Sequence, residues 1–347
     1  MESKMRTDKP FKTIKEQIQI LKNRNLIFLN EETAKNALSR YGYYEIINGY
    51  KDHFLNEKGN DELGFKTGTT FEHIYALYSL DKDISRDLLK ALEDFEQTFK
   101  QSLAYVVSEN ISEIDSSYCA VSHFNTGKTY GRDRRGNLKC DRARLLKRFD
   151  KIKRTDNEPF HHYSANHNNI PPWIMVKGLT FGQFLYWYRL SKPTIRHKTI
   201  LRLIGAQKIF SQNDQLLREF YQLYGDIFAL YLSYRNLTAH GGRVFNNRSK
   251  KHALRKSPIL YNSDRINVSN RAFNKGKYRS SIGMVIYTLG LFDNSQPAYY
   301  AYVWILAELK NYLKKYPEDK DYLIKSMEFD IFPNLEYDLN HEDIKAF

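Results

Sequence analysis

One amphipathic segment constrains the fold of this chain more than any other feature. Its apolar residues recur every three or four positions, as on one face of an α-helix: Ile84, Leu88, Leu92, Phe95, Phe99 and Leu103. Thr70 is the expected N-cap of this helix, which should run past Val106. A stripe of this length has to be covered by other helices, so the sequence predicts an all-α fold, a bundle of many helices.

Weaker patterns of the same kind predict the partner helices. The expected helical ranges are 14–25, 31–40, 43–55, 181–190, 211–238, 281–292 and 298–315. A capping-box pattern at Thr13, with Glu16, opens the first of them, and Asn30 and Thr180 are expected N-caps. The ranges 56–68 and 157–172 are predicted to be polar connections, and no alternating pattern is long enough to build a sheet. The organisation that follows is an N-terminal helical region (1–68), a helical domain (69–315) and a C-terminal tail (316–347).

The charge of the chain indicates a polyanionic partner. Fifty-four Lys and Arg residues against 40 Asp and Glu give a net charge of +14, which attracts nucleic acid. Much of the excess lies in two basic insertions, 126–154 and 243–279. The first is expected to be a loop followed by a helix, and the second a loop or partly disordered. Solvated loops without a partner are the alternative. The residues assigned to RNA binding here are Arg134, Arg135, Arg142, Lys147, Arg248, Lys250, Lys251 and Arg255.

Other classes of protein find no support in the sequence. No apolar run approaches the roughly 18 residues of a membrane-spanning helix, and the N-terminus lacks the apolar core of a secretion signal. Two cysteines, Cys119 and Cys140, are too few for a disulfide framework or a four-cysteine zinc site. We therefore expect a cytoplasmic protein with no membrane association, no metal and no cofactor.

The segment from Tyr234 to Arg243 contains the residues best suited to chemistry. Arg235 and His240 are separated by four residues, and Gly241 and Gly242 are expected to end the preceding helix. RNA is cleaved when its 2′-hydroxyl attacks the adjacent phosphate, which requires proton transfer and relief of negative charge. Histidine can transfer the proton, and arginine grips phosphate oxygens. A second Arg–His pair, at 154 and 161, is less suitable because Pro159 interrupts it.

Helical geometry limits how this pair can act. Residues five apart lie about 140° apart around a helix, so Arg235 and His240 do not share a face, whereas Asn236 and His240 do. Arg235 must then reach over, or two copies of the chain must combine their residues. The structural alternative is that His240 only caps the helix, while Arg235 pairs with Asp226 or Glu219.

The chain also resembles the abortive-infection AbiD/AbiF family of bacterial phage-defence proteins, of the HEPN superfamily. The similar segments, in family order, are KPFKTIKEQIQILKNRNL (9–26), ALSRYGYYEIINGY (37–50), the helical stretch 71–100, PPWIMVKGLTFGQFLYWYRLS (171–191) and YRNLTAHGGRVFNN (234–247). The resemblance implies a HEPN-like helical bundle, RNA as the target, and a role in growth arrest alongside a small structured RNA. It assigns Arg235, Asn236 and His240 as catalytic, with Arg243 and Asn246 at the rim of the site.

The chain departs from its relatives in two respects. Relatives often carry a second histidine where Gly241 stands, and their connectors are shorter or less basic than 126–154 and 243–279. Two functions therefore remain open. One is a metal-independent endoribonuclease toxin, for which a homodimer is the expected state because two copies would share the site. The other is a non-catalytic RNA-binding module of a toxin–antitoxin-like ribonucleoprotein. A DNA-binding regulator has less support, because no persuasive helix-turn-helix or zinc finger is present.

Overall fold

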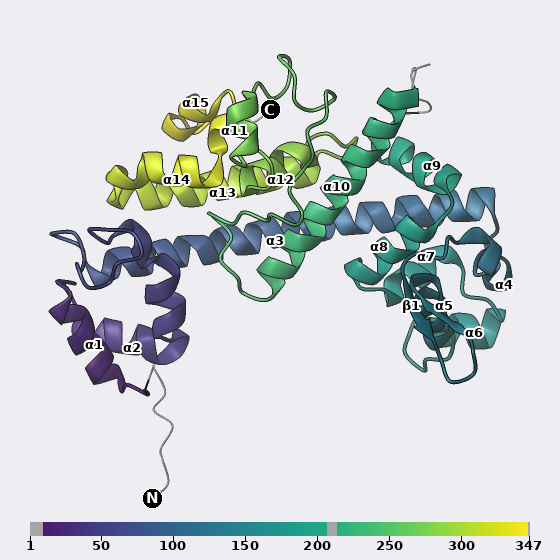
Figure 1. Ribbon diagram of the computed structural model, residues 1–347, viewed down its shortest axis with the longest axis horizontal. Helices are drawn as coiled ribbons and strands as arrows, with labels where there is room; N and C mark the ends of the chain where they lie inside the picture. Colours follow the sequence, from purple (N-terminus) through teal and green to yellow (C-terminus); the bar gives the residue numbers. More distant parts are fainter. Residues whose placement is uncertain (1–9, 207–213, 346–347) are drawn as a thin grey trace, which may run out of the picture.

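The computed structural model describes residues 10–206 and 214–345, and one helix of 40 residues, α3 (Phe71–Asn110), is its axis (Figure 1). Thr70 caps this helix, because its side chain accepts a hydrogen bond from the backbone N–H of His73 at 3.1 Å. The stripe read from the sequence is buried along its whole length, from Ile84 to Leu103. The prediction of one long, covered helix is confirmed.

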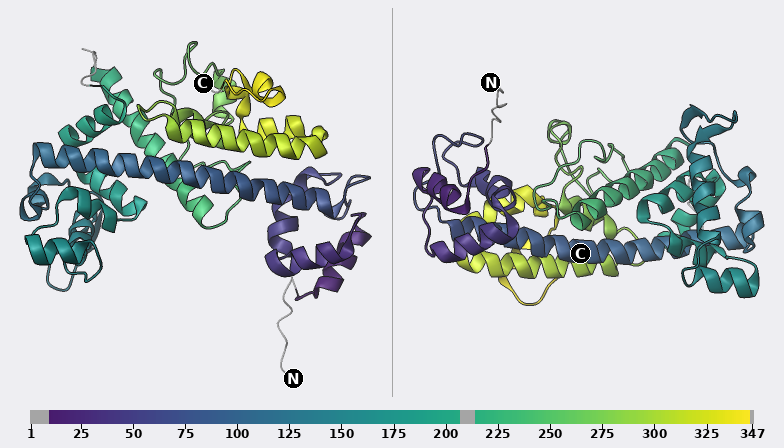
Figure 2. Two further views of the ribbon diagram at one scale, coloured as in Figure 1. Left: turned by 180° about the vertical axis from the view of Figure 1, so that it is seen from behind. Right: turned by 90° about the horizontal axis from the view of Figure 1, so that it is seen from below.

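Several helices cover the length of α3. The helix α13 (Gln296–Lys315) runs beside it, and α10 (Asp214–Ala239) crosses it obliquely (Figures 1 and 2). The helices α8 (Phe181–Leu190), α9 (Pro193–Leu203) and α12 (Ile282–Leu289) pack around this group. Aromatic rings fill the crossing of α3 and α10, where the ring centroids of Phe99 and Phe228 lie 4.2 Å apart. The expected all-α bundle is confirmed.

The N-terminal helices lie near the first turns of α3, on the side away from α13 (Figure 1). The capping box at Thr13 opens α1 (Ile14–Asn23), and Asn30 caps α2 (Glu31–Tyr41), both as predicted. The range 43–55 is not the regular helix that the sequence suggested. It forms a π-helical turn, η1 (Tyr44–Asn48), and a 3-10 turn, η2 (Lys51–His53). Ile46 and Ile47, both within the π-helical turn, are fully buried.

The first basic insertion holds a feature that the sequence did not reveal. A two-stranded antiparallel hairpin, β1 (Thr129–Arg132) with β2 (Leu138–Cys140), precedes α5 (Asp141–Lys153). The expectation of no sheet is wrong here, because such short and mostly exposed strands carry no alternating apolar pattern. The carboxylate of Asp133 shapes the turn by accepting hydrogen bonds from the backbone of Arg135 and Asn137, at 2.8 and 2.9 Å.

Short helices replace the polar connection expected at 157–172. These are α6 (Phe160–His167) and the start of α7 (Pro172–Met175), which continues into the 3-10 turn η4 (Val176–Gly178). Another short helix, α4 (Asp115–Tyr118), follows α3. The helix predicted at 211–238 is observed as α10, and its first three expected residues, 211–213, lie outside the described residues.

The second basic insertion is irregular, as expected, yet it is folded rather than disordered. It contains one short helix, α11 (Asn270–Asn274), and its buried side chains anchor it to the bundle. The anchoring residues are Val244, Phe245, Leu254, Leu260, Ile266 and Phe273. Their irregular spacing hides them from any search for periodicity, which is why disorder was the wrong part of the expectation.

The last residues of the chain pack on α13 and α12. They form a 3-10 turn, η5 (Pro317–Asp319), then α14 (Lys320–Met327), η6 (Phe329–Ile331) and α15 (Leu335–Asn340). Leu323, Met327 and Phe329 are fully buried in this region. Within the described ranges, no helix combines the length and the apolar character that crossing a membrane requires.

Candidate functional site

The helix that carries the Arg–His motif ends in a Schellman motif. The backbone N–H of Gly241 donates to the carbonyl of Thr238 at 3.1 Å, and that of Gly242 donates to the carbonyl of Leu237 at 2.9 Å. Gly241 has φ +70°, a conformation that suits glycine. His240 therefore stands at the C-cap of α10, with its N–H bonded to the carbonyl of Asn236 at 3.1 Å.

The imidazole of His240 is open to solvent. Its residue is exposed, and within 10–206 and 214–345 no hydrogen bond or ion pair engages the ring. Asn236, one turn earlier, is exposed too, and the backbone bond between them confirms that they lie one above the other on the helix. This edge of α10 can therefore accept a ligand without first breaking an internal contact.

Arg235 points to a different place, toward α3. Its Nε lies 3.6 Å from Oε2 of Glu96, and its side chain keeps 30% of its exposure. The same Nε is buried and has no hydrogen-bond partner among the described residues. Glu96 is also held by Lys100, at 2.6 Å. The predicted structural partners of Arg235 are not the observed ones, since Asp226 binds Arg255 instead.

The guanidinium of Arg235 lines a polar groove of about 410 Å³. The groove runs between α3, the end of α10 and the turn at 176–178. Besides Arg235 its charged and amide-bearing lining residues are Glu93, Glu96, Gln97, Lys100, Gln101 and Lys177. Three cations against two carboxylates leave the groove weakly positive. It is thus able to take a phosphate, but His240 is not part of its wall.

The two motif residues are attached to distant parts of α3. Lys82 donates to the carbonyl of Gly241, next to His240, at 2.6 Å, whereas Arg235 reaches Glu96. At 1.5 Å of rise per residue, these two anchor points on α3 are about 21 Å apart. In the described part of one chain, no hydrogen bond or ion pair joins Arg235 to His240. The expectation that the pair does not share a face of the helix agrees with this arrangement.

The loop that follows the motif is fixed by a buried carboxylate. Asp81 of α3, which is fully buried, accepts hydrogen bonds from the backbone N–H groups of Val244 (3.0 Å) and Phe245 (2.7 Å) and from the hydroxyl of Tyr50 (2.6 Å). Burial raises the pKa of Asp81, and the bonds from Tyr50, Phe245 and Val244 oppose this shift. Sequence reasoning overlooked Asp81, although an acid at a stripe position, between Leu77 and Ile84, was a usable signal.

A buried tyrosine gives the same loop a second attachment. The hydroxyl of Tyr234, directly before Arg235, donates to the carbonyls of Ser280 (2.8 Å) and Asn247 (3.1 Å). Burial raises the pKa of this hydroxyl. The predicted rim residues lie on this anchored loop: Arg243 is exposed, 5.9 Å from the ring centre of Tyr50, and Asn246 is half-buried.

Of the other four residues assigned to RNA binding in the second insertion, two are exposed lysines and two are arginines that contact acidic residues. Lys250 and Lys251 are exposed. Arg248 lies 3.5 Å from Glu328, in a loose ion pair. Arg255 is bound by both oxygens of Asp226 through Nε and Nη2, each at 2.7 Å. Arg255 is thus occupied by a contact that holds the insertion to α10, and it is less free than the sequence suggested.

The first insertion presents its cations elsewhere on the molecule. Arg134 and Arg135 are exposed at the turn of the hairpin, and Lys147 is exposed on α5. Arg142 donates to the carbonyl of Phe124 at 3.2 Å. The hairpin and α11 lie on opposite sides of α3 in two views of the molecule (Figures 1 and 2). The hairpin and the part of the second insertion around α11 therefore lie on different sides of α3.

Comparison with known proteins was made against family models, curated proteins and solved structures. A model described as Abi-like protein matches residues 36–246, well over half of the chain. The chain belongs to the Abi-like protein family. Among curated proteins and solved structures, no match was found. Membership places this Abi-like chain in abortive infection, a defence against phage. The match includes Asp81 and the whole Arg–His segment, and it ends before most of the second insertion.

Proposed function

We propose that this Abi-like protein is a HEPN-type endoribonuclease that cleaves RNA without a metal ion during abortive infection. The observation that carries the proposal is that the side chains of the Arg–His motif are accessible to a substrate. His240 and Asn236 are exposed at the end of α10, and Arg235 opens into a groove able to hold a phosphate. The exposed side chains of His240 and Asn236 can contact a substrate directly, whereas Arg235 has to exchange its loose ion pair with Glu96, at 3.6 Å, for the phosphate.

The proposed reaction uses only protein groups. The imidazole of His240 takes the proton from a 2′-hydroxyl and then gives it to the departing 5′-oxygen. The new bond joins the 2′-oxygen to phosphorus as the bond to the 5′-oxygen breaks. Arg235 balances the negative charge of the phosphorane through its planar pair of N–H donors. The products are a 2′,3′-cyclic phosphate and a 5′-hydroxyl end.

A site shared by two copies of the chain is the arrangement that we favour. Within one chain Arg235 lies in its groove and His240 at the far turn of the helix, without an interaction between them. A two-fold axis beside the end of α10 would place Arg235 of one copy near His240 of the other. Asn236, one turn before His240, would then hold the ribose or phosphate at the same edge.

The test is cleavage of cellular RNA by the purified protein in EDTA. We expect cleavage that leaves cyclic-phosphate and 5′-hydroxyl ends, and a loss of about 100-fold or more in Arg235→Ala and in His240→Ala. Matched controls are Arg40→Ala and His341→Ala, which remove an exposed arginine and an exposed histidine elsewhere. Cleavage that survives in His240→Ala, or that requires added Mg²⁺, would refute the mechanism.

The ion pair of Arg235 supports one competing function. Glu96 lies 3.6 Å from Nε of Arg235, so Arg235 is positioned to act as a structural or phosphate-binding group without turnover. The protein would then be a non-catalytic RNA-binding module that holds a small structured RNA. That function predicts RNA that copurifies with the protein and stays intact, with equal retention in the wild type and in His240→Ala.

A further inference from the structure

The second basic insertion encloses a cationic pocket outside the proposed cleavage site. The pocket has a volume of about 460 Å³ and is built from three separate stretches, 248–253, 274–280 and Glu328. Its cationic lining residues are Arg248, Lys250, Lys275, Lys277 and Arg279, and the hydroxyl-bearing residues Ser249 and Ser280 stand beside them. The volume lies in the range of small-ligand sites.

Most of this positive charge is not neutralised by the protein. Lys250 and Lys275 are exposed, and no carboxylate in the described ranges binds either ammonium group. Arg279 donates to the carbonyl of Leu254 at 3.0 Å, which satisfies a hydrogen bond but not the charge. Two of the five cations have acidic neighbours: Arg248 has Glu328 at 3.5 Å, and Lys277 has Asp330 at 3.1 Å.

The walls of the pocket are tied together, so the pocket is preformed. The backbone N–H of Leu254 donates to the carbonyl of Arg279 at 2.8 Å, which joins two of its stretches. Glu328 accepts from the backbone N–H of Tyr278 at 2.9 Å, which joins the third. The Tyr234 hydroxyl, through Ser280, attaches the pocket to α10 one residue before Arg235.

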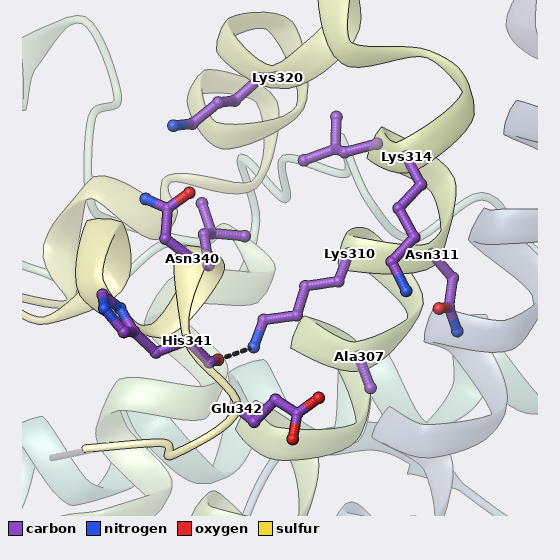
Figure 3. A pocket seen from close by; sticks show the side chains of 10 residues that line it. Ala307, Lys310, Asn311, Lys314, Lys320, Asn340, His341 and Glu342 are labelled. Atoms are coloured by element: carbon purple, nitrogen blue, oxygen red, sulfur yellow. Dashed lines mark hydrogen bonds between the residues drawn. The ribbon is translucent and has the colours of Figure 1, made fainter.

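A second hollow of similar size shows what distinguishes this pocket. That hollow, about 470 Å³, lies between α13 and the residues after α15, and Lys310, Lys314 and Lys320 surround it (Figure 3). The ammonium group of Lys310 is bound to the carbonyl of His341, and Lys320 pairs with Glu336 at 2.7 Å. Only Lys314 remains without an acceptor in the described part of the chain. The pocket of the second insertion is therefore the better anion site.

We propose that this pocket binds a terminal polyphosphate, carried by a free nucleoside triphosphate or by the 5′ end of an RNA. A polyphosphate concentrates several negative charges within a few ångströms, which matches a cavity lined by five cations, three of them without an acidic partner among the described residues. The backbone of RNA instead presents a single charge per nucleotide, which suits an extended surface. The proposal does not rest on nuclease activity and holds whether or not the chain cleaves RNA.

The first test measures the affinity of the full-length protein for inorganic tripolyphosphate by isothermal titration calorimetry, with Mg²⁺ and with EDTA. The variant is Lys250→Ala/Lys275→Ala, whose side chains are exposed and hold no described contact. The matched control, Lys314→Ala/Lys139→Ala, removes the same charge from outside the pocket. We expect the pocket variant to bind at least about tenfold more weakly than wild type, and the control to bind like wild type. Equal weakening in both variants, or no binding to wild type, would overturn the proposal.

The second test identifies the source of the polyphosphate. ATP and GTP are compared with one RNA oligomer prepared with a 5′-triphosphate or with a 5′-hydroxyl. Tighter binding of the triphosphate RNA, lost in the pocket variant, would assign the pocket to RNA ends. Competition by the free nucleotides at equal affinity would assign it to nucleotides. If the pocket variant weakens the 5′-hydroxyl RNA as much as the triphosphate RNA, the pocket binds ordinary backbone and the proposal fails.

Discussion

Replacing Asp81 should release the loop that follows the Arg–His motif. In Asp81→Ala the buried N–H groups of Val244 and Phe245 lose their acceptor, and so does the hydroxyl of Tyr50. A buried donor left without an acceptor costs about 1–3 kcal/mol. Removing the carboxylate also removes the cost of burying it, which offsets part of the loss. We expect a net destabilisation of about 3–5 kcal/mol.

Two further variants calibrate this value. Tyr50→Phe removes one of the three hydrogen bonds and should cost about 1.5–3 kcal/mol, because the bond involves a charged acceptor. Asp83→Ala, two residues away on α3, removes a half-exposed acid whose ion pair is with Arg86, and should cost less than about 1 kcal/mol. The loss of folding free energy should be largest for Asp81→Ala, smaller for Tyr50→Phe and smallest for Asp83→Ala. This order would show that the buried hydrogen bonds of Asp81, and not the negative charge of α3, hold the loop.

Urea unfolding measures the overall loss of stability, and hydrogen exchange shows where in the chain the structure is loosened. Urea unfolding, followed by circular dichroism, gives the loss of folding free energy. Hydrogen exchange should show the largest loss of protection at 243–248, since the backbone N–H groups of Val244 and Phe245 lose their acceptor there. If Asp81→Ala is no more costly than Asp83→Ala, or if protection at 243–248 is unchanged, Asp81 does not hold the loop.

Two other predictions concern the helix end and the acid sensitivity of the fold. Gly241→Ala should destabilise the protein by roughly 1–2 kcal/mol, because φ is +70° there. Gly225→Ala, in open space within α10, should instead stabilise the protein by about 0.5–1 kcal/mol, and urea unfolding measures both changes. Burial alone would raise the pKa of Asp319, but hydrogen bonds, led by those from His53 and His73, hold it well below its ordinary value. The stability from Asp319 is therefore present above the ordinary pKa of an aspartate and is lost as the pH falls below it. Asp319→Asn should lower stability at neutral pH and flatten its decline in acid, and a decline as steep as in the wild type would contradict this.

The sequence predicts features that repeat and misses features that depend on distant contacts. The stripe of α3 and the caps at Thr13, Asn30, Thr70 and Thr180 are local patterns, and each is found where expected. The β1–β2 hairpin escaped prediction because its strands are short and exposed. The second insertion was predicted to be a loop or partly disordered because its anchors have no period, although their apolar character was visible.

At the candidate site, too, the features set by local sequence were predicted and those set by distant contacts were not. The Arg–His spacing and the paired glycines indicated the motif and the end of its helix, and both follow from local chemistry. The partner of Arg235 was not predicted, because the sequence suggested only the nearby acids Asp226 and Glu219, whereas Glu96 is distant in the chain. The polyphosphate pocket was also out of reach, since it joins stretches as far apart as 250 and 328.

The most direct test of the shared site is a complementation measurement. Arg235→Ala and His240→Ala, each inactive alone, are coexpressed with different tags and purified as a mixed pair, and RNA cleavage is measured in EDTA. If Arg235 of one copy acts together with His240 of the other, a mixed pair retains one of its two sites. In an equal random mixture half of the pairs are mixed, so the mixture regains about a quarter of wild-type activity. Mixed pairs that form and bind RNA but remain as inactive as either variant alone would contradict a site built across two copies.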